Sequence, residues 1–164
     1  MTAFIGLGGN LGDPRKNLSE AISHLAEFFI VEKKSSLYRT IPVGGPPGQP
    51  VCYNAVAQFK TSGNPIDSFH TLRTIERRMG RTKAEKWAPR IIDLDLLDQD
   101  GVIVEGQELT LPHPMLHLRA FVLLPLNEIA PDWRHPRLNS TPNEMIEKLT
   151  AEDKSVIIAV EDWP

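Results

Sequence analysis

The stretch WAPRIIDLDLL, residues 87–97, has the apolar character of a central strand but carries two carboxylates separated by one leucine. Side chains alternate along a strand, so Asp93 and Asp95 lie on one face. The other face carries three apolar side chains, those of Ile92, Leu94 and Leu96. The sequence therefore predicts a strand whose apolar face is buried in a core and whose acidic face lines a cleft.

The two carboxylates are close enough to repel one another. Two residues along a strand span about 6.5–7 Å, and two negative charges at that distance cost roughly 2–3 kcal/mol at an effective dielectric of about 20. A bound cation removes this cost, and Mg²⁺ prefers one or two carboxylates together with water and substrate phosphates. We therefore predict a magnesium site at Asp93 and Asp95. The alternative is a solvated strand face with two unrelated acids.

Basic residues gather immediately before the acidic pair. Residues 73–90 hold seven basic and two acidic side chains, a local net charge of +5 in a chain whose formal net charge is -3. This pattern indicates a small polyanion that also needs a metal ion, although a solvated basic helix face has the same composition. Residues 80–89, GRTKAEKWAP, predict a cationic loop that closes over phosphate groups. Trp87 in this loop either covers a flat ligand or pins the loop to the body.

Length and composition limit the class of protein. With 164 residues, 41% hydrophobic and 24% charged, the chain is predicted to form one domain, residues 1–164, with an ordinary apolar core. Cys52 is the single cysteine, which excludes a disulfide framework and a cysteine-built zinc site. The first residues lack a signal-peptide pattern, and no run approaches the roughly 20 apolar residues of a membrane span. We expect a cytoplasmic protein.

The order of predicted elements indicates an α+β fold. Strands are expected at 3–8, 30–40, 52–61, 91–97 and 155–160, and helices at 14–29, 65–79, 117–131 and 140–150. Gly101 is expected to turn the fourth strand into a hairpin with residues 102–106, and the proline- and glycine-rich residues 42–50 form a surface loop. The predicted result is a two-layer sandwich in which helices pack on an antiparallel sheet.

Residues 6–12, GLGGNLG, resemble a dinucleotide-binding fingerprint because they lie between a predicted strand and a predicted helix. Leu11 occupies the position of the third glycine, and Glu32, the nearest candidate for a ribose-binding acid, lies beside two lysines. We therefore interpret the glycines as a tight turn whose Gly8 and Gly9 backbone lines a site.

Residues 111–121, LPHPMLHLRAF, add groups suited to phosphate. Arg119 is predicted to bind phosphate through its guanidinium group, with His113 as a hydrogen-bond donor beside it. His113 and His117 also have the spacing of half a zinc site. Pro114 interrupts the helix between them, however, and the sequence offers no third soft ligand.

Together these motifs resemble the 6-hydroxymethyl-7,8-dihydropterin pyrophosphokinase family. The similarity covers residues 3 to about 131, through FIGLGGNLGD, LYRT, YNAV, IERRMGR, WAPRIIDLDLL, LPHP and LRAFVLLPLNEIAP. The resemblance implies a ferredoxin-like α+β fold and a step of folate biosynthesis, in which ATP gives its terminal pyrophosphoryl group to the pterin hydroxymethyl and AMP is released. It also implies ATP as co-substrate, two Mg²⁺ ions, and a monomer that binds neither nucleic acid nor membrane.

The resemblance further implies roles for individual residues. Asp93 and Asp95 would hold the magnesium ions, and Arg81 and Arg90 would clamp phosphate. The implied nucleotide contacts are Arg73, Glu76, Lys83, Thr110, His113 and Arg119. The implied pterin contacts are Thr40, Val43, Cys52, Asn54, Trp87 and Phe121.

The chain departs from the family pattern at several positions. Cys52 stands where members often carry an aromatic side chain that stacks on the pterin. Strand alternation places Cys52 on the face of Asn54 and Tyr53 on the opposite face. Arg73 replaces an expected glutamine, Pro114 replaces a tyrosine, and the loop before the signature strand is one residue short.

Two other functions share parts of this pattern. A glycosyltransferase also uses an aspartate-x-aspartate metal motif, but it needs a larger nucleotide-binding domain than this chain supplies. A small RNA-binding module would use residues 73–90 with Trp87 stacked on a base, and the acidic total charge argues against it. For pyrophosphoryl transfer, Asp95 is a hypothetical acceptor of the hydroxyl proton, and we expect the pterin to bind well only after the nucleotide.

Overall fold

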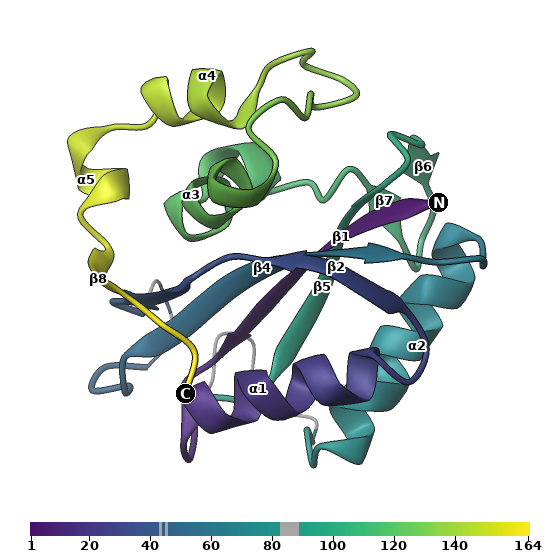
Figure 1. The fold of residues 1–164 in the computed structure, drawn as a ribbon. Coiled ribbons are helices and arrows are strands. Elements are labelled where there is room, and N and C mark those ends of the chain that lie inside the picture. Colours follow the sequence, from purple (N-terminus) through teal and green to yellow (C-terminus); the bar gives the residue numbers. More distant parts are fainter. Residues whose placement is uncertain (43, 45, 83–88) are drawn as a thin grey trace.

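Six strands in the described part of the chain form one antiparallel sheet in the order β5-β1-β4-β3-β8, with β2 also paired to β4 (Figure 1). The computed structural model describes residues 1–42, 44, 46–82 and 89–164. The strands are β1 (Thr2–Gly9), β2 (Ile30–Lys34), β3 (Leu37–Thr40), β4 (Cys52–Lys60), β5 (Asp93–Gln99) and β8 (Ile157–Glu161). Two shorter strands pair with each other, β6 (Val104–Glu105) and β7 (Thr110–Leu111). The order of β1 to β5 is that of the predicted ferredoxin-like fold.

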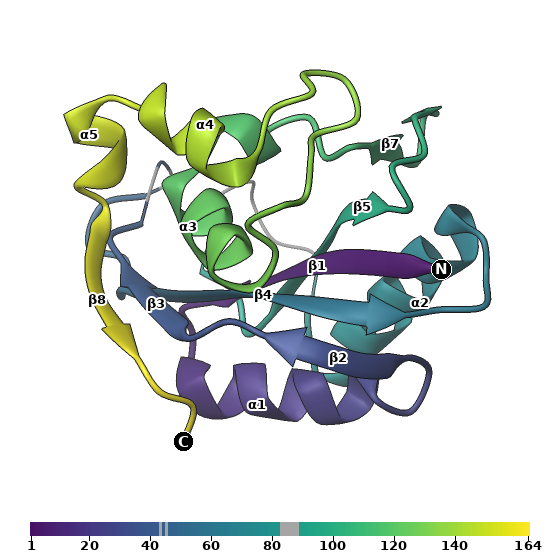
Figure 2. The same cartoon turned by 45° about the horizontal axis from the view of Figure 1, so that its top comes forward.

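Helices cover both faces of the sheet. One face carries α1 (Pro14–Leu25) and α2 (Pro65–Arg78), below the sheet in Figure 1, and the other carries α3 (Ala120–Ile129) with α4 (Pro142–Glu147). Figure 2 shows the same arrangement after a turn, with α5 (Ala151–Lys154) leading into β8. The predicted α+β sandwich with an antiparallel sheet is confirmed. The helices α3 and α4 form a third layer that the two-layer description did not include.

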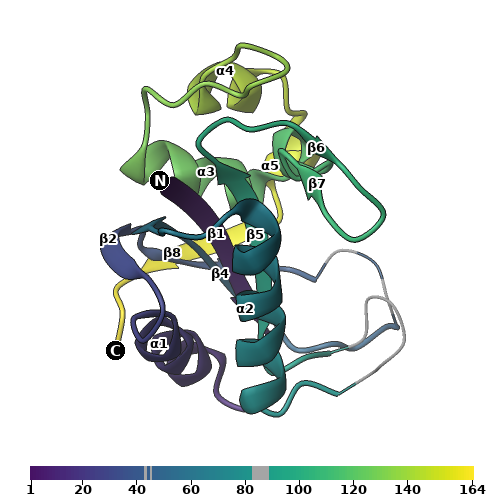
Figure 3. The same cartoon turned by 90° about the vertical axis from the view of Figure 1, so that its right-hand side faces the viewer.

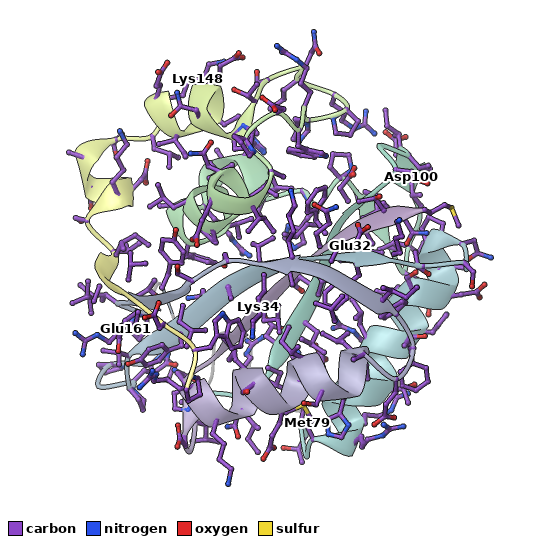
Figure 4. The ribbon with its side chains drawn as sticks, in the orientation of Figure 1. Glu32, Lys34, Met79, Asp100, Lys148 and Glu161 are labelled. Atoms are coloured by element: carbon purple, nitrogen blue, oxygen red, sulfur yellow. The ribbon has the colours of Figure 1, made fainter. Side chains whose placement is uncertain are left out.

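Alternation along the strands creates an apolar core on each face. Ile5 and Leu7 of β1 face α1 and α2, whereas Phe4 faces α3. The apolar stripe predicted for α2 packs into the first core, where Leu72 is fully buried and Met79, labelled in Figure 4, is partly buried. The face of the sheet that α3 covers therefore carries both an apolar core and the functional groups described below.

Both helices on the first face begin at capping side chains. Asp13 caps α1 and Asn64 caps α2, each by accepting a hydrogen bond from a backbone N–H in the first turn. α1 ends at Leu25, four residues before its predicted end. The chain then turns, and a hydrogen bond from Phe29 N to Leu25 O at 2.9 Å brings the Phe29 ring into the core. α2 ends before Gly80, whose φ of +92° suits a glycine that closes a helix.

Two strand predictions are wrong in detail. The strand expected at 30–40 divides into β2 and β3 at Ser35, whose side chain accepts a hydrogen bond from Val56 N at 3.0 Å in place of a regular ladder. Residues 102–106 do not form a hairpin with β5, because β6 pairs with β7 instead. Gly101 has a φ of +67° and turns the chain away from β5, which leaves β5 at the edge of the large sheet.

The elements after β7 are shorter than predicted. The helix expected at 117–131 begins at Ala120, after a short 3₁₀ turn (Leu116–Leu118). The helix expected at 140–150 is the shorter α4, and Thr150 caps the separate α5. Among the described residues, no helix combines the length and the apolarity needed to cross a bilayer.

Candidate active site

A cavity of about 660 Å³ lies on the α3 side of the sheet, at the end where β1 and β3 finish and β4 and β5 begin. Its walls come from these strands, from residues 113–122 and from the C-terminal residues 152–156. Thirteen residues predicted from the sequence line it: Gly8, Gly9, Thr40, Cys52, Asn54, Arg73, Arg81, Arg90, Asp93, Asp95, His113, Arg119 and Phe121. The groups predicted to contact phosphate and pterin thus surround one space.

Asp93 and Asp95 lie at the start of β5 and line this cavity. Both are half-buried, whereas Leu94 between them is fully buried in the core between the sheet and the helices α1 and α2. The alternation predicted from DLDLL is therefore confirmed. One short strand presents two carboxylates to the same space.

α2 holds the backbone between the two aspartates from the outer edge of β5, and Figure 3 shows the helix running alongside this strand. The carboxylate of Glu76 accepts a hydrogen bond from Leu94 N at 2.8 Å, and a guanidinium nitrogen of Arg73 donates to Leu94 O. Arg73 and Glu76 also form an ion pair at 3.2 Å. Because both polar groups of Leu94 are occupied, the strand that carries the aspartates is fixed at its edge.

Two arginines share the carboxylate of Asp93. Arg81 Nη1 lies 2.7 Å from Asp93 Oδ1 and 2.8 Å from Glu76 Oε1. Arg90 Nη1 lies 3.3 Å from Asp93 Oδ2. Among the described residues, none donates a hydrogen bond to the carboxylate of Asp95. The two acids therefore differ, since only one is directly paired with guanidinium groups.

Negative charge at this site is only partly compensated. Burial and the neighbouring charge of Asp93 raise the pKa of the Asp95 carboxyl above its usual range, although Arg73 acts in the opposite direction. Burial also raises the pKa of Glu76, against the charge of Arg73 and the hydrogen bond from Leu94. Additional positive charge in the cavity would stabilise both carboxylates. A divalent cation supplies such charge.

His113 and Arg119 occupy the wall that precedes α3. His113 N donates to Leu97 O at 2.8 Å, and His113 Nδ1 accepts a hydrogen bond from Met115 N at 3.1 Å. Burial and the nearby Arg119 lower the pKa of His113 to about 4, so its ring is neutral at pH 7. Because Nδ1 is an acceptor, Nε2 carries the proton and is a hydrogen-bond donor.

The donor set fits magnesium and not zinc. His117 does not join His113, because its ring packs against His135 with 6.0 Å between centroids. In the part of the chain that the structure describes, no group of three or more histidine, cysteine or acidic side chains is arranged to hold a metal ion. Asp93 and Asp95 supply two carboxylates, which is the number that Mg²⁺ takes from a protein when substrate phosphates complete its coordination.

Part of the cavity lining is neutral. Asn54 and Cys52 face the cavity from β4, and Asn54 Nδ2 donates to Thr40 Oγ1 at 2.8 Å. Tyr53 faces the core between the sheet and α1. Its hydroxyl donates to Glu161, labelled in Figure 4, at 3.1 Å. The predicted alternation along this strand is confirmed. Burial raises the pKa of the Cys52 thiol, so this position presents a small neutral group.

Some residues named from the sequence lie elsewhere. Thr110 is exposed in β7 and is not part of the cavity lining. Glu76 is buried behind β5 and holds this strand. The predictions for Val43, Lys83 and Trp87 lie outside the described residues.

The structure also adds lining residues that the sequence did not single out. They come from the turn after β1, the loop before β4 and the C-terminal segment: Asn10, Gln49, Glu152, Asp153 and Val156. Asn10 directly follows the glycines of GLGGNLG, which was the available signal for that residue. No sequence pattern indicates that the C-terminal segment lines the cavity. The segment reaches it because Ile41 N donates to Val156 O at 2.8 Å beside β3.

A family model described as 7,8-dihydro-6-hydroxymethylpterin-pyrophosphokinase (HPPK) matches residues 4–131. The chain belongs to this family. The match runs from β1 through α3 and includes every cavity residue named above except those of the C-terminal segment. The resemblance noted in the sequence is confirmed, and with it the predicted enzyme class, a pyrophosphokinase acting on a hydroxymethyl dihydropterin.

Relatives of the HPPK family agree with this match. The chain is 43% identical over 149 residues to the 2-amino-4-hydroxy-6-hydroxymethyldihydropteridine pyrophosphokinase of Synechocystis sp., covering 90% of this chain and 75% of that protein. It is 40% identical over 135 residues to the protein of the same name from Haemophilus influenzae, covering 80% of this chain and 83% of that one.

Solved structures share the HPPK fold. A crystal structure of Plasmodium falciparum HPPK-DHPS matches with a TM-score of 0.71 and 17% identity, covering 90% of this chain and 43% of that chain. This chain therefore spans less than half the length of that protein. At this identity the likeness concerns the fold alone.

Proposed function

We propose that the cavity transfers the terminal pyrophosphoryl group of ATP to the hydroxyl of 6-hydroxymethyl-7,8-dihydropterin, which yields the pterin pyrophosphate and AMP in folate biosynthesis. The observation that carries this proposal is that Asp93 and Asp95 line the same cavity as arginine side chains and as Asn54 and Phe121. Carboxylates with arginines suit a metal-bound triphosphate. An amide with an aromatic ring suits a flat heterocycle with amide-like edges.

Asp93 and Asp95 would hold magnesium, and we propose two ions. Bound magnesium neutralises charge on the triphosphate during transfer. The carboxylates fit this role because they share a face, because α2 fixes the intervening Leu94, and because burial and the charge of Asp93 raise the pKa of Asp95, which a bound cation would counter. Glu76 contributes by holding the strand and not by contacting the nucleotide.

Arg81 and Arg90 are proposed to bind phosphate oxygens. Both now pair with Asp93, so a cation at that carboxylate competes with these ion pairs. Phosphate oxygens in the same cavity are alternative partners for the two guanidinium groups, which favour bidentate contacts with phosphate. Metal binding and nucleotide binding are therefore linked, since each makes the other less costly. His113 and Arg119 add a neutral and a charged donor on the adjacent wall.

The pterin is proposed to lie between Asn54 and Phe121. The bond from Asn54 Nδ2 to Thr40 directs Asn54 Oδ1 toward Gly8, where a Cβ atom would come within 2.7 Å of it. Glycine at position 8 therefore leaves this acceptor accessible to ligand N–H groups. Phe121 lines the cavity with its ring centre 5.5 Å from the Arg119 guanidinium carbon, and the small Cys52 leaves more room than an aromatic residue would.

The transfer itself needs positioning more than covalent chemistry. The pterin hydroxyl attacks the β-phosphorus in line with the departing AMP oxygen, and arginine side chains stabilise the charge on the transferring group. No side chain becomes covalently attached. Asp95 remains the hypothetical acceptor of the hydroxyl proton.

Two properties of the whole protein belong to this proposal. We propose that the chain acts as a monomer, because one chain alone supplies the groups assigned to both substrates around a single cavity. We also propose a cytoplasmic location, which suits a protein whose single cysteine, Cys52, is a free thiol. Light scattering on the purified protein, with and without nucleotide, measures the first property directly.

The test of the proposed function is a product assay. Purified protein with ATP, Mg²⁺ and 6-hydroxymethyl-7,8-dihydropterin is expected to form AMP and pterin pyrophosphate in equal amounts, and chelation of the metal is expected to stop both. Formation of ADP, or consumption of ATP at the same rate without the pterin, would contradict the proposal.

A further inference from the structure

Asn10 joins three segments that border the cavity. It directly follows β1, and its side chain is only 5% exposed. Asn10 Nδ2 donates to Gln49 Oε1 at 3.2 Å and to Pro50 O at 3.3 Å. Asn10 Oδ1 accepts a hydrogen bond from Arg90 N at 3.0 Å. The backbone N–H groups of Asn10 and Leu11 both donate to Arg90 O, at 3.1 and 3.2 Å, so the turn after β1 holds both ends of Arg90.

The two glycines before Asn10 allow this close approach. A Cβ atom at Gly9 would lie 2.5 Å from Ile91 O and 3.5 Å from Arg90 O. A Cβ atom at Gly8 would lie 2.7 Å from Asn54 Oδ1. Contacts under 3.0 Å with backbone cannot be relieved by a small side-chain movement. Gly9 therefore allows the segment at Arg90 to lie against the end of β1, whereas the close contact at Gly8 is with a side chain.

The segments that Asn10 joins belong to different halves of the cavity. Arg90 pairs with the Asp93 carboxylate at 3.3 Å, on the side proposed for phosphate. Gln49 and Pro50 lead directly into β4, which presents Cys52 and Asn54 on the side proposed for the pterin. A single buried amide thus lies between the groups that contact the two substrates.

We propose that Asn10 is a positioning residue that couples the two halves of the cavity, so that nucleotide bound at Arg90 raises the affinity for the pterin. This inference rests on the function proposed above. A shift of the Arg90 peptide changes the hydrogen bond at Asn10 Oδ1, and the same amide orients Gln49 and Pro50 through Nδ2. By linkage, the pterin raises nucleotide affinity by the same factor.

Two substitutions separate the two ends of this connection. Asn10→Asp keeps an acceptor for Arg90 N but loses the donor to Gln49 and Pro50. Gln49→Ala removes one partner on the pterin side and leaves the bonds to Arg90 intact. Asn17→Asp is the matched control, because Asn17 Nδ2 donates to Leu11 O at 3.1 Å in the same turn without contacting the cavity.

Calorimetric titration measures the coupling directly. The probes are 6-hydroxymethylpterin and α,β-methylene-ATP with Mg²⁺, each titrated alone and in the presence of the other. In the parent protein we expect the nucleotide to tighten pterin binding at least about tenfold, within the usual range of couplings between sites. Asn10→Asp is expected to reduce this factor about fivefold or more while its affinity for nucleotide alone stays within about twofold, and Gln49→Ala to reduce it about twofold. Asn17→Asp is expected to keep the parental factor.

The possible outcomes separate this inference from the function beneath it. Parental coupling in both Asn10→Asp and Gln49→Ala would overturn the role of Asn10 and leave the proposed function standing. An equal loss of affinity for the two ligands, each titrated alone into Asn10→Asp, would also overturn it, because that result would indicate a structural role. If Asn10→Asp does not fold, Gln49→Ala decides the question. Failure of the parent protein to bind the pterin under any condition would instead contradict the proposed function.

Discussion

The two halves of the cavity are built from different interactions. The phosphate half is held by ion pairs, in which Arg81 and Arg90 contact Asp93 and α2 clamps the backbone of β5. The pterin half is held by a neutral hydrogen bond between Asn54 and Thr40 and by an aromatic wall. On the proposed function, charge in the first half would act on the transferring group, whereas shape in the second half would select the acceptor. Substitutions in the two halves should therefore affect kcat and KM differently.

Removal of Asp95 should have the largest effect. Asp95→Ala is expected to lower the rate of AMP formation by about a thousandfold or more, because charge stabilisation by a bound metal is worth several kcal/mol. Initial rates at saturating ATP and pterin measure this change. Asp132→Ala, which removes an exposed carboxylate that is not part of the cavity lining, serves as the control and should keep the parental rate. A near-parental rate for Asp95→Ala would show that the phosphate half is wrongly assigned.

Loss of Arg81 should have the next largest effect. Arg81→Ala is expected to lower kcat about a hundredfold, comparable to removal of one preorganised donor at a charged transition state. The KM for the pterin should change little, since Arg81 contacts Glu76 and Asp93 and no group of the pterin half. Arg78→Ala is the control, because it breaks an ion pair of 2.7 Å with Glu27 on the surface. If Arg81→Ala instead raised the KM for the pterin with kcat unchanged, that result would contradict the division of the cavity into two halves.

Truncation of Phe121 should show the opposite pattern. Phe121→Ala is expected to raise the KM for the pterin about tenfold, because stacking of a base on an aromatic ring is worth about 1–3 kcal/mol. The kcat and the affinity for α,β-methylene-ATP should stay within about twofold of the parent. Steady-state kinetics with each substrate varied in turn separate these quantities. Phe28→Ala, at an exposed phenylalanine, controls for loss of a ring as such. A change in metal dependence at Phe121 would argue against a neutral pterin half.

The smallest of the predicted effects concerns His113 and the stability of the fold. Its folded pKa of about 4 lies below the unfolded value near 6.5, so the unfolded state binds more protons between these pH values. The free energy of unfolding should therefore fall as the pH is lowered through this window. For this partly exposed ring we expect a loss of about 1–2 kcal/mol between pH 7 and pH 5.

Urea unfolding at the two pH values measures the contribution of His113. His113→Gln should remove this part of the pH dependence, whereas His70→Gln, at an exposed histidine, should leave it unchanged. Identical pH dependence in the parent and in His113→Gln would show that the ring is not kept neutral by its surroundings.

Local rules allowed the sequence to predict the side chains that face the cavity. The period of two along a strand placed Asp93 with Asp95, and it placed Cys52 with Asn54 on the same basis. The stripe on α2 followed from helical spacing in the same way. These predictions needed only the conformation of one segment at a time, which is why they are confirmed.

Features that depend on several segments could not be predicted. Glu76 holds Leu94 because α2 runs beside β5, which is an edge strand. The sequence predicted instead that residues 102–106 pair with β5 in a hairpin. Asn10 acquires its partners from the loop before β4 and from Arg90, which are 39 and 80 residues away in the chain. The C-terminal wall depends on the pairing of β8 with β3. No local periodicity encodes such meetings.

The central claim, that Asp93 and Asp95 hold metal ions for a nucleotide, is tested most directly by binding without chemistry. Calorimetric titration of α,β-methylene-ATP is compared with and without Mg²⁺ for the parent and for the double variant Asp93→Asn, Asp95→Asn. We expect Mg²⁺ to tighten nucleotide binding at least about tenfold in the parent and to have almost no effect in the double variant. An equal gain from Mg²⁺ in both proteins would contradict the claim and would leave the two carboxylates as partners of arginine alone.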